Sequence, residues 1–169
     1  MDFSVNILAL GIPFSVALLL ASLGEMFNQR AGVFNLGCEG IMAMGAFLGM
    51  LVPYCVGHGG PVPETFNVLG LLLAMAVGAL LGILFGLVVV SFRAPQGIAG
   101  IGLQMFGVGT AGTLFRHFVG GTQSVPGIDR LPIPVLSEIP FLGPVLFSHN
   151  PLVYLTFLLV PAAWYILFR

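Results

Sequence analysis

Residues 68–90 read VLGLLLAMAVGALLGILFGLVVV and contain no charged side chain. As a helix, an apolar run of this length crosses the hydrocarbon core of a membrane, because about 20 residues at a rise of 1.5 Å cover roughly 30 Å. A barrel strand is excluded, because apolar and polar residues do not alternate and a backbone in lipid must satisfy its own hydrogen bonds. The stretch therefore predicts a transmembrane helix.

The rest of the chain has the same apolar character. Of its 169 residues, 58% are hydrophobic and 7% are charged, and the mean hydropathy is +1.10. Further runs long enough to span the membrane cover approximately 6–24, 36–56, 97–115 and 152–168. The first run lacks the basic flank and cleavage site of a signal peptide, so we expect it to be retained. The sequence predicts an all-α polytopic transmembrane helix bundle of about five spans, forming a single transmembrane domain over residues 1–169.

The charges set an orientation and exclude one class of partner. The five basic residues are all arginine, and with six acids they give a formal net charge of -1, which leaves no basic face for nucleic acid. Membrane lipid is the partner that the apolar runs imply. Arg30, Arg93 and Arg169 favour a cytoplasmic position for the connections that hold them, although Arg116 and Arg130 fall on the other side. We expect an external N-terminus and a cytoplasmic C-terminus.

No pattern in the sequence predicts catalysis, a metal site or another cofactor. Cys38 and Cys55 lie about 25 Å apart along one predicted helix, too far for a disulfide. The histidines have no metal-ligand spacing and are expected to be solvated loop residues: His58, His117 and His149. Residues 107–112 match a G-x-G-x-x-G fingerprint by letter, but they lie inside a predicted membrane helix with no strand before them. We expect no nucleotide there.

Two other features concern packing. Small residues recur at every fourth position of the run quoted above, at Gly70, Ala74, Gly78, Gly82 and Gly86, and they predict a face that another helix can approach closely. Static packing and a moving interface are both open interpretations of this face. The segment 118–151 is proline-rich and cannot form a straight helix. We expect it to be a structured external cap before the last span, either plugging the bundle or offering a docking surface.

Polar groups at the start of the second run are the strongest candidates for function. Asn35 can cap a helix that begins at Leu36, and Glu39 then lies in its first turns, near the positive end of the helix dipole. A carboxylate at this depth needs a polar partner or water, so it should face the bundle interior. Two interpretations are open: a structural ion pair with Arg30, or a lining residue of a transport pathway. Gln104, an amide at membrane depth in the fourth run, is a second pathway candidate.

The fourth run begins much like the second. Residues 93–97 read RAPQG, so this span also starts beside an arginine with a proline- and glycine-containing entry. Paired interrupted spans indicate discontinuous helices around a substrate site.

Three blocks of the sequence resemble one family in its order. NQRAGVFNLGCEGIMAMGAF, residues 28–47, resembles the E-R-x-G-hydrophobic-hydrophobic-N-hydrophobic-G-hydrophobic-E-G segment of permeases from the ABC importers for nucleosides and simple sugars, which are related to the ribose and branched-chain amino acid permeases. RAPQGIAGIGLQMFGVGTAGTLFR and IPVLSEIPFLGPVLFSHNPLVY resemble two later segments of the same permeases. Residues 35–40 are most similar to the nucleoside type. The chain departs from the pattern at Gln29, Ala99 and Gln104.

The resemblance implies a permease subunit of an ATP-binding-cassette importer in the inner (plasma) membrane, moving a small polar solute by alternating access. It implies partners as well: cytoplasmic ABC ATPase subunits, an external solute-binding protein and a second permease subunit, as a homo- or heterodimer. No covalent chemistry is expected in this chain. For a nucleoside or sugar, Asn35 and Gln104 with Phe34 and Phe106 would form a weak polar and aromatic site. Related permeases continue past the position of Arg169, so we expect this chain to be a partial permease domain.

Two other classes are open from the residues alone. A secondary transporter or channel would use Glu39 for ion or proton coupling and would need no ATPase. A membrane scaffold that transports nothing is favoured only by the small size and the glycine faces. Uptake by vesicles with and without ATP and partner subunits distinguishes the three classes.

Overall fold

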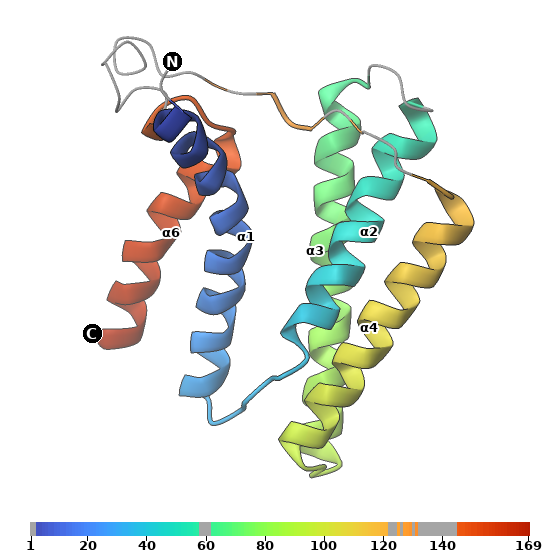
Figure 1. Cartoon of the computed structure of the whole chain (residues 1–169). Coiled ribbons are helices and arrows are strands. Elements are labelled where there is room, and N and C mark those ends of the chain that lie inside the picture. The colour runs from blue at the N-terminus through green and yellow to red at the C-terminus, as the bar shows by residue number, and fades with distance from the viewer. Residues whose placement is uncertain (1–2, 58–61, 122–124, 126, 130, 132–144) are drawn as a thin grey trace. The chain divides into compact units, whose positions relative to one another are not determined.

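A computed structural model describes residues 3–57, 62–121, 125, 127–129, 131 and 145–169, and its regular elements are all helices (Figure 1). In chain order these are α1 (Phe3–Arg30), α2 (Cys38–Gly57), α3 (Glu64–Gly86), a short π-helix (Leu87–Ser91), α4 (Gln96–Phe118) and α6 (Pro151–Phe168). They form two compact units: unit 1 contains α1 and α6, and unit 2 contains α2, α3 and α4. Most of the proline-rich segment expected to cap the bundle lies outside the described residues.

The predicted spans are confirmed. Among the described residues, five helices are long and apolar enough to cross a membrane. Large apolar side chains are exposed on these helices; for example, Phe14 is 79% exposed and Met105 is 73% exposed. Surfaces of this kind are expected to face lipid. The chain is therefore a multi-pass membrane protein with an all-α fold.

Unit 1 pairs α1 with α6, which run side by side in the same direction (Figure 1). At the ends of both helices, the Arg30 guanidinium lies over the Phe168 ring, 5.7 Å from its centroid. At the beginning of α6, the expectation of a solvated His149 is wrong. This residue is only 4% exposed, and its Nε2 lies 2.6 Å from the Val145 carbonyl oxygen. The expectation rested on the absence of metal-ligand spacing, and that spacing does not indicate whether a histidine side chain is buried.

In unit 2, α2 and α3 cross closely and in opposite directions. The space that a side chain at Gly70 would need is filled by the Gly49 carbonyl oxygen. That oxygen has no helical hydrogen-bond donor four residues later, because position 53 is a proline. A Cβ at Gly49 would in turn lie 3.2 Å from the Ala74 Cβ. Glycine on both helices therefore permits a backbone-to-backbone contact.

The predicted small-residue face of α3 is only half used. Gly70, Ala74 and Gly78 lie against α2, at residues that include Gly49 and Ile41. Gly82 and Gly86 have nothing within 4 Å of an added Cβ in the described structure. The interpretation of one continuous packing ridge must therefore be corrected. The contact of this face with α2 therefore ends before Gly82, although Leu81 and Phe85 in the same turns of α3 are buried.

The end of α3 widens into the π-helix before the chain turns. The Phe92 N–H donates to the Leu87 carbonyl five residues earlier at 3.1 Å, and the Ala94 N–H donates to the Val88 carbonyl at 3.2 Å. Arg93 then has a φ of 55°, the left-handed conformation that non-glycine residues seldom adopt. This compact turn brings the chain directly to the start of α4.

Candidate functional site

Helices α2 and α4 lie side by side and run parallel, so both begin at the same end of unit 2 (Figure 1). Each begins after a non-helical stretch: residues 31–37 precede α2, and residues 92–95 precede α4. We call residues 31–37 the entry segment. The sequence predicted two interrupted entries, and their proximity follows because a single antiparallel helix, α3, separates them in the chain.

Glu39 and Gln104, the two candidates chosen for their polarity at membrane depth, meet between α2 and α4. The Gln104 Nε2 donates a hydrogen bond of 2.6 Å to the Glu39 Oε2. Glu39 is exposed and Gln104 is half-buried, so the pair lies at an accessible edge of the helix contact. An amide and a carboxylate here present donors and acceptors to any polar solute that reaches them. The structure gives Glu39 this partner, and within unit 1 it places the Arg30 guanidinium over the Phe168 ring.

Glycine brings these two helices close enough for the pair to form. A Cβ at Gly40 would lie 2.6 Å from the Leu103 carbonyl oxygen and 2.7 Å from the Gln104 Cα. From the other side, Gly107 packs directly on the Gly40 backbone. Gly107 is the first glycine of the G-x-G-x-x-G match at residues 107–112, and in the structure it lies at this helix crossing.

Asn35 acts locally at the start of α2. Its side chain is 7% exposed, and its Oδ1 accepts a hydrogen bond of 2.8 Å from the Gly37 N–H. The expectation that the helix begins at Leu36 is wrong by two residues. The backbone bond that the structure gives at the start of α2 runs from the Ile41 N–H to the Gly37 carbonyl, so Gly37 is the last residue before the helix.

The two candidate phenylalanines do not form one aromatic cluster with the pair. Phe34 belongs to the entry segment and is 46% exposed. Phe106 is 57% exposed and follows Gln104 by two residues, so it lies on nearly the opposite side of α4. The structure therefore joins Glu39 with Gln104, places Asn35 in the cap and leaves Phe106 facing away.

Gln96 is a residue that the sequence reasoning missed. Its Oε1 accepts a hydrogen bond of 2.8 Å from the Phe34 N–H, and its Nε2 donates one of 3.2 Å to the Gly32 carbonyl. The amide thus binds the entry segment across more than 60 residues of sequence. A polar residue at the first position of an apolar helix was the available signal, but helix starts are commonly polar for local reasons.

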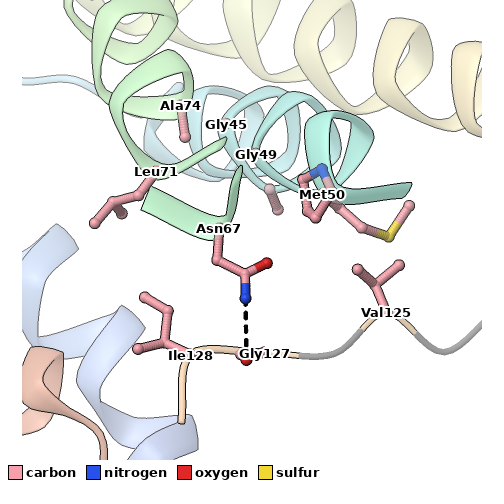
Figure 2. Close-up of a pocket in the computed structure, with 11 residues that line it drawn as sticks. Gly45, Gly49, Met50, Asn67, Leu71, Ala74, Val125, Gly127 and Ile128 are labelled. Atoms are coloured by element: carbon pink, nitrogen blue, oxygen red, sulfur yellow. Dashed lines mark hydrogen bonds between the residues drawn. The ribbon is translucent and has the colours of Figure 1, made fainter. Parts of the chain in front are cut away.

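A cavity of about 370 Å³ lies between α2, α3 and the residues Val125, Gly127 and Ile128 (Figure 2). Its walls are small or apolar, and they include Gly45, Met50 and Leu71. Asn67 is the buried amide of this cavity, and its Nδ2 donates a hydrogen bond of 3.1 Å to the Gly127 carbonyl (Figure 2). This cavity lies toward the opposite end of α2 from Glu39.

One face of α2 connects the two places. Ala46, Met50 and Pro53 line the cavity, and they follow Glu39 by seven, eleven and fourteen residues. Side chains at these spacings point in nearly the same direction, because an α-helix turns by about 100° per residue. Glu39 and these three cavity residues therefore share a face of α2, and the three lie about 10 to 21 Å from Glu39 along the axis at 1.5 Å per residue.

Comparison with known proteins gives consistent matches over the chain. Residues 7–169 match the family described as the permease component of the branched-chain amino acid transport system. The chain is 35% identical to the guanosine ABC transporter permease protein NupQ of Bacillus subtilis, over 98% of this chain and 54% of that protein. It is 31% identical to TsgC13 of Haloferax volcanii, described as a glucose ABC transporter permease, over 100% of this chain and 50% of that protein.

A third relative is the nucleoside ABC transporter permease protein NupC of Lactococcus lactis, which is 29% identical over 92% of this chain and 50% of its own length. The chain spans about half the length of the curated relatives it matches. No solved structure matches it.

Proposed function

The chain belongs to the family of permease components of branched-chain amino acid transport systems, and we propose that it is part of the membrane-spanning subunit of an ABC importer. The proposed solute is a nucleoside or a simple sugar. Support comes from the relatives, of which two carry nucleoside substrates in their names and one carries glucose. The proposed mechanism is alternating access, with no covalent chemistry in this chain.

The face of α2 that runs from Glu39 to Pro53 is the proposed solute pathway. The observation that carries this proposal is the Glu39–Gln104 hydrogen bond, a polar pair held by two membrane helices at the end of that face. The Asn67 cavity provides a second polar position at its other end. A nucleoside or sugar is uncharged and rich in donors and acceptors, so it can exchange hydrogen bonds with these groups in turn.

The composition of the pathway favours passage over retention. Between its two polar ends the α2 face presents Ala46 and Met50, which offer contact area without strong hydrogen bonds. Solutes must bind well enough to enter a pathway and weakly enough to leave it. Phe34 lies near the pair in sequence and is exposed, so it is the aromatic residue available to a base or sugar ring at that end.

The remaining components follow from the proposed function. ATP hydrolysis is assigned to separate cytoplasmic subunits, delivery of solute to an external binding protein, and completion of the pathway to a second permease subunit. The proposed location is the inner (plasma) membrane, with Arg30, Arg93 and Arg169 facing the cytoplasm. In this orientation the Glu39–Gln104 pair lies toward the cytoplasmic end and the Asn67 cavity toward the external end.

Solute uptake by the Glu39→Gln variant tests this proposal. The substitution keeps the shape of the side chain and an oxygen that can accept from Gln104, but it removes the charge. Glu64→Gln is the matched control, because Glu64 lies in the exposed first turn of α3 near the other end of unit 2. The permease is assembled with its ATPase and binding protein in vesicles, and uptake is measured per folded permease.

Glu39→Gln is expected to assemble normally and to reduce uptake, whereas Glu64→Gln should match the wild type. Wild-type uptake by Glu39→Gln would show that the charge is dispensable. Loss of folded protein in proportion to uptake would instead assign Glu39 a structural role. Uptake that persists without ATP would favour the secondary transporter or channel class.

A further inference from the structure

The residues of α4 that contact the entry segment and the first turn of α2 lie on one face of α4. Gln96, Gly100 and Gln104 are spaced four residues apart, so they lie on one face of that helix. Gln96 binds the backbone of residues 32 and 34, and Gln104 binds Glu39. Between them, a Cβ at Gly100 would lie 2.7 Å from the Leu36 backbone nitrogen, so the two backbones touch there. Successive turns of α4 thus contact successive parts of the entry segment and the first turn of α2.

Of the two contacts that α4 makes with the entry segment itself, at Gln96 and at Gly100, the one at Gln96 is directional. A primary amide that accepts from one peptide N–H and donates to a nearby peptide carbonyl reproduces the pairing of a neighbouring strand. Both bonds form only when residues 32–34 lie at one position along α4. The Gly100 contact is backbone packing, which limits how close the chains come but tolerates sliding more readily than a pair of hydrogen bonds.

The entry segment needs such an external tie. Gly32 has a φ of +81°, so the chain turns sharply just before the bonded residues. Residues 33–35 form neither a helix nor a turn. The segment carries Phe34 and Asn35. It ends directly before Cys38, the first residue of α2, so it leads into the helical turn that holds Glu39.

We propose that Gln96 is a positioning residue, which fixes the register of the entry segment on α4 and thereby sets where Glu39 meets Gln104. This inference rests on the proposed pathway role of Glu39. Gln96 itself need not touch the solute. Loss of its amide should free the entry segment while leaving the α2–α3 crossing at Gly49 and Gly70 in place.

The test uses Gln96→Met, which keeps the length of the side chain and removes both hydrogen bonds. Gln96→Glu is the second variant, because it retains an acceptor for the Phe34 N–H if the methionine variant fails to fold. Thr113→Val is the matched control on the same helix: it removes a hydroxyl whose hydrogen bond, to the Gly109 carbonyl at 2.8 Å, is local.

The first readout is independent of transport. In a Cys55→Ser background, Cys38 is the only thiol of the chain, and it lies at the first position of α2. Its rate of reaction with a membrane-permeant maleimide should rise by roughly five- to thirtyfold in Gln96→Met, which is what the net loss of one to two hydrogen bonds represents in an equilibrium constant. Thr113→Val should leave the rate unchanged.

The second readout is uptake by the assembled importer, with Glu39→Gln measured beside it. Positioning predicts that Gln96→Met changes KM or the maximal rate while the yield of folded permease and its thermal stability stay near wild type. An unchanged Cys38 rate together with unchanged uptake would overturn the inference. A parallel loss of folded protein, stability and uptake in both Gln96 variants would overturn it too, by assigning Gln96 a purely structural role.

The two proposals fail separately. If Glu39→Gln transports normally, the pathway assignment falls, while the Cys38 rate still reports whether Gln96 positions the entry segment. If Glu39→Gln loses uptake and Gln96→Met changes neither readout, only the positioning role is refuted.

Discussion

Substituting Gly40 by alanine adds one methyl group at the closest approach of α2 and α4. The new Cβ would lie 2.6 Å from the Leu103 carbonyl oxygen, whereas ordinary van der Waals contact begins at 3.4 Å. Both partners are backbone, which cannot turn aside as a flexible side chain can. The helices must therefore separate by about 0.8 Å, the difference between these two distances.

Two losses follow from this separation. Overpacking of this kind typically costs about 1 to 3 kcal/mol. The Glu39–Gln104 hydrogen bond, now 2.6 Å, would also stretch past the 3.2 Å at which N–H···O bonds weaken. With a shift of about 2 to 4 °C per kcal/mol for a chain of this size, the melting temperature should fall by roughly 2 to 12 °C.

Gly102→Ala is the matched control, because it makes the same chemical change on α4 at a position with nothing within 4 Å of the added Cβ. Alanine is the better helix former, by up to about 1 kcal/mol in soluble helices, so Gly102→Ala should melt at or above the wild-type temperature. Thermal unfolding of both variants in the same detergent gives the comparison. Equal melting temperatures for Gly40→Ala and Gly102→Ala would refute the close crossing of α2 and α4.

Further predictions concern packing, capping and topology. Gly70→Leu should lower folded yield because the Gly49 carbonyl fills that space, whereas Gly82→Leu should be tolerated; equal yields would contradict the α2–α3 crossing. Asn35→Ala should destabilise α2 by about 0.5 to 2 kcal/mol in thermal unfolding, and Asn35→Asp, which keeps an acceptor, should not. On intact cells an impermeant maleimide should label Cys55 and not Cys38; the reverse result would invert the proposed orientation.

The spans were predictable because each depends on a local property, the hydropathy of about twenty consecutive residues. Their ends were less predictable. Helix α2 starts at Cys38 and not at Leu36, because the Gly37 carbonyl accepts the backbone bond at its start, and hydropathy does not indicate which carbonyl that will be. Helix α3 continues into a π-helix for which the apolar run gives no indication, since all of its residues suit a membrane helix equally well.

The candidate site was predictable in part. Glu39 and Gln104 could be selected one at a time, because each is a polar group in an apolar run and needs a partner. That they are partners of each other depends on the crossing of α2 and α4, which a residue separation of 65 conceals. The role of Gln96 was hidden for the same reason. The burial of His149 depends on a carbonyl four residues away and on the fold around it, which composition does not reveal.

The π-helix at Leu87–Ser91 has a consequence for sequence variation at the end of α3. A π-turn closes its hydrogen bonds over five residues instead of four, as the bond from Phe92 to Leu87 shows, so it holds one residue more than an α-helix of the same course. Deleting one residue there would let the turn relax to α geometry while Arg93 and the start of α4 kept their places. A deletion within α4 between Gln96 and Gln104 has no such reserve, because it would rotate one of the two amides away from α2 by about 100°. Single-residue deletions should therefore be tolerated before the α3–α4 connection and rejected after it.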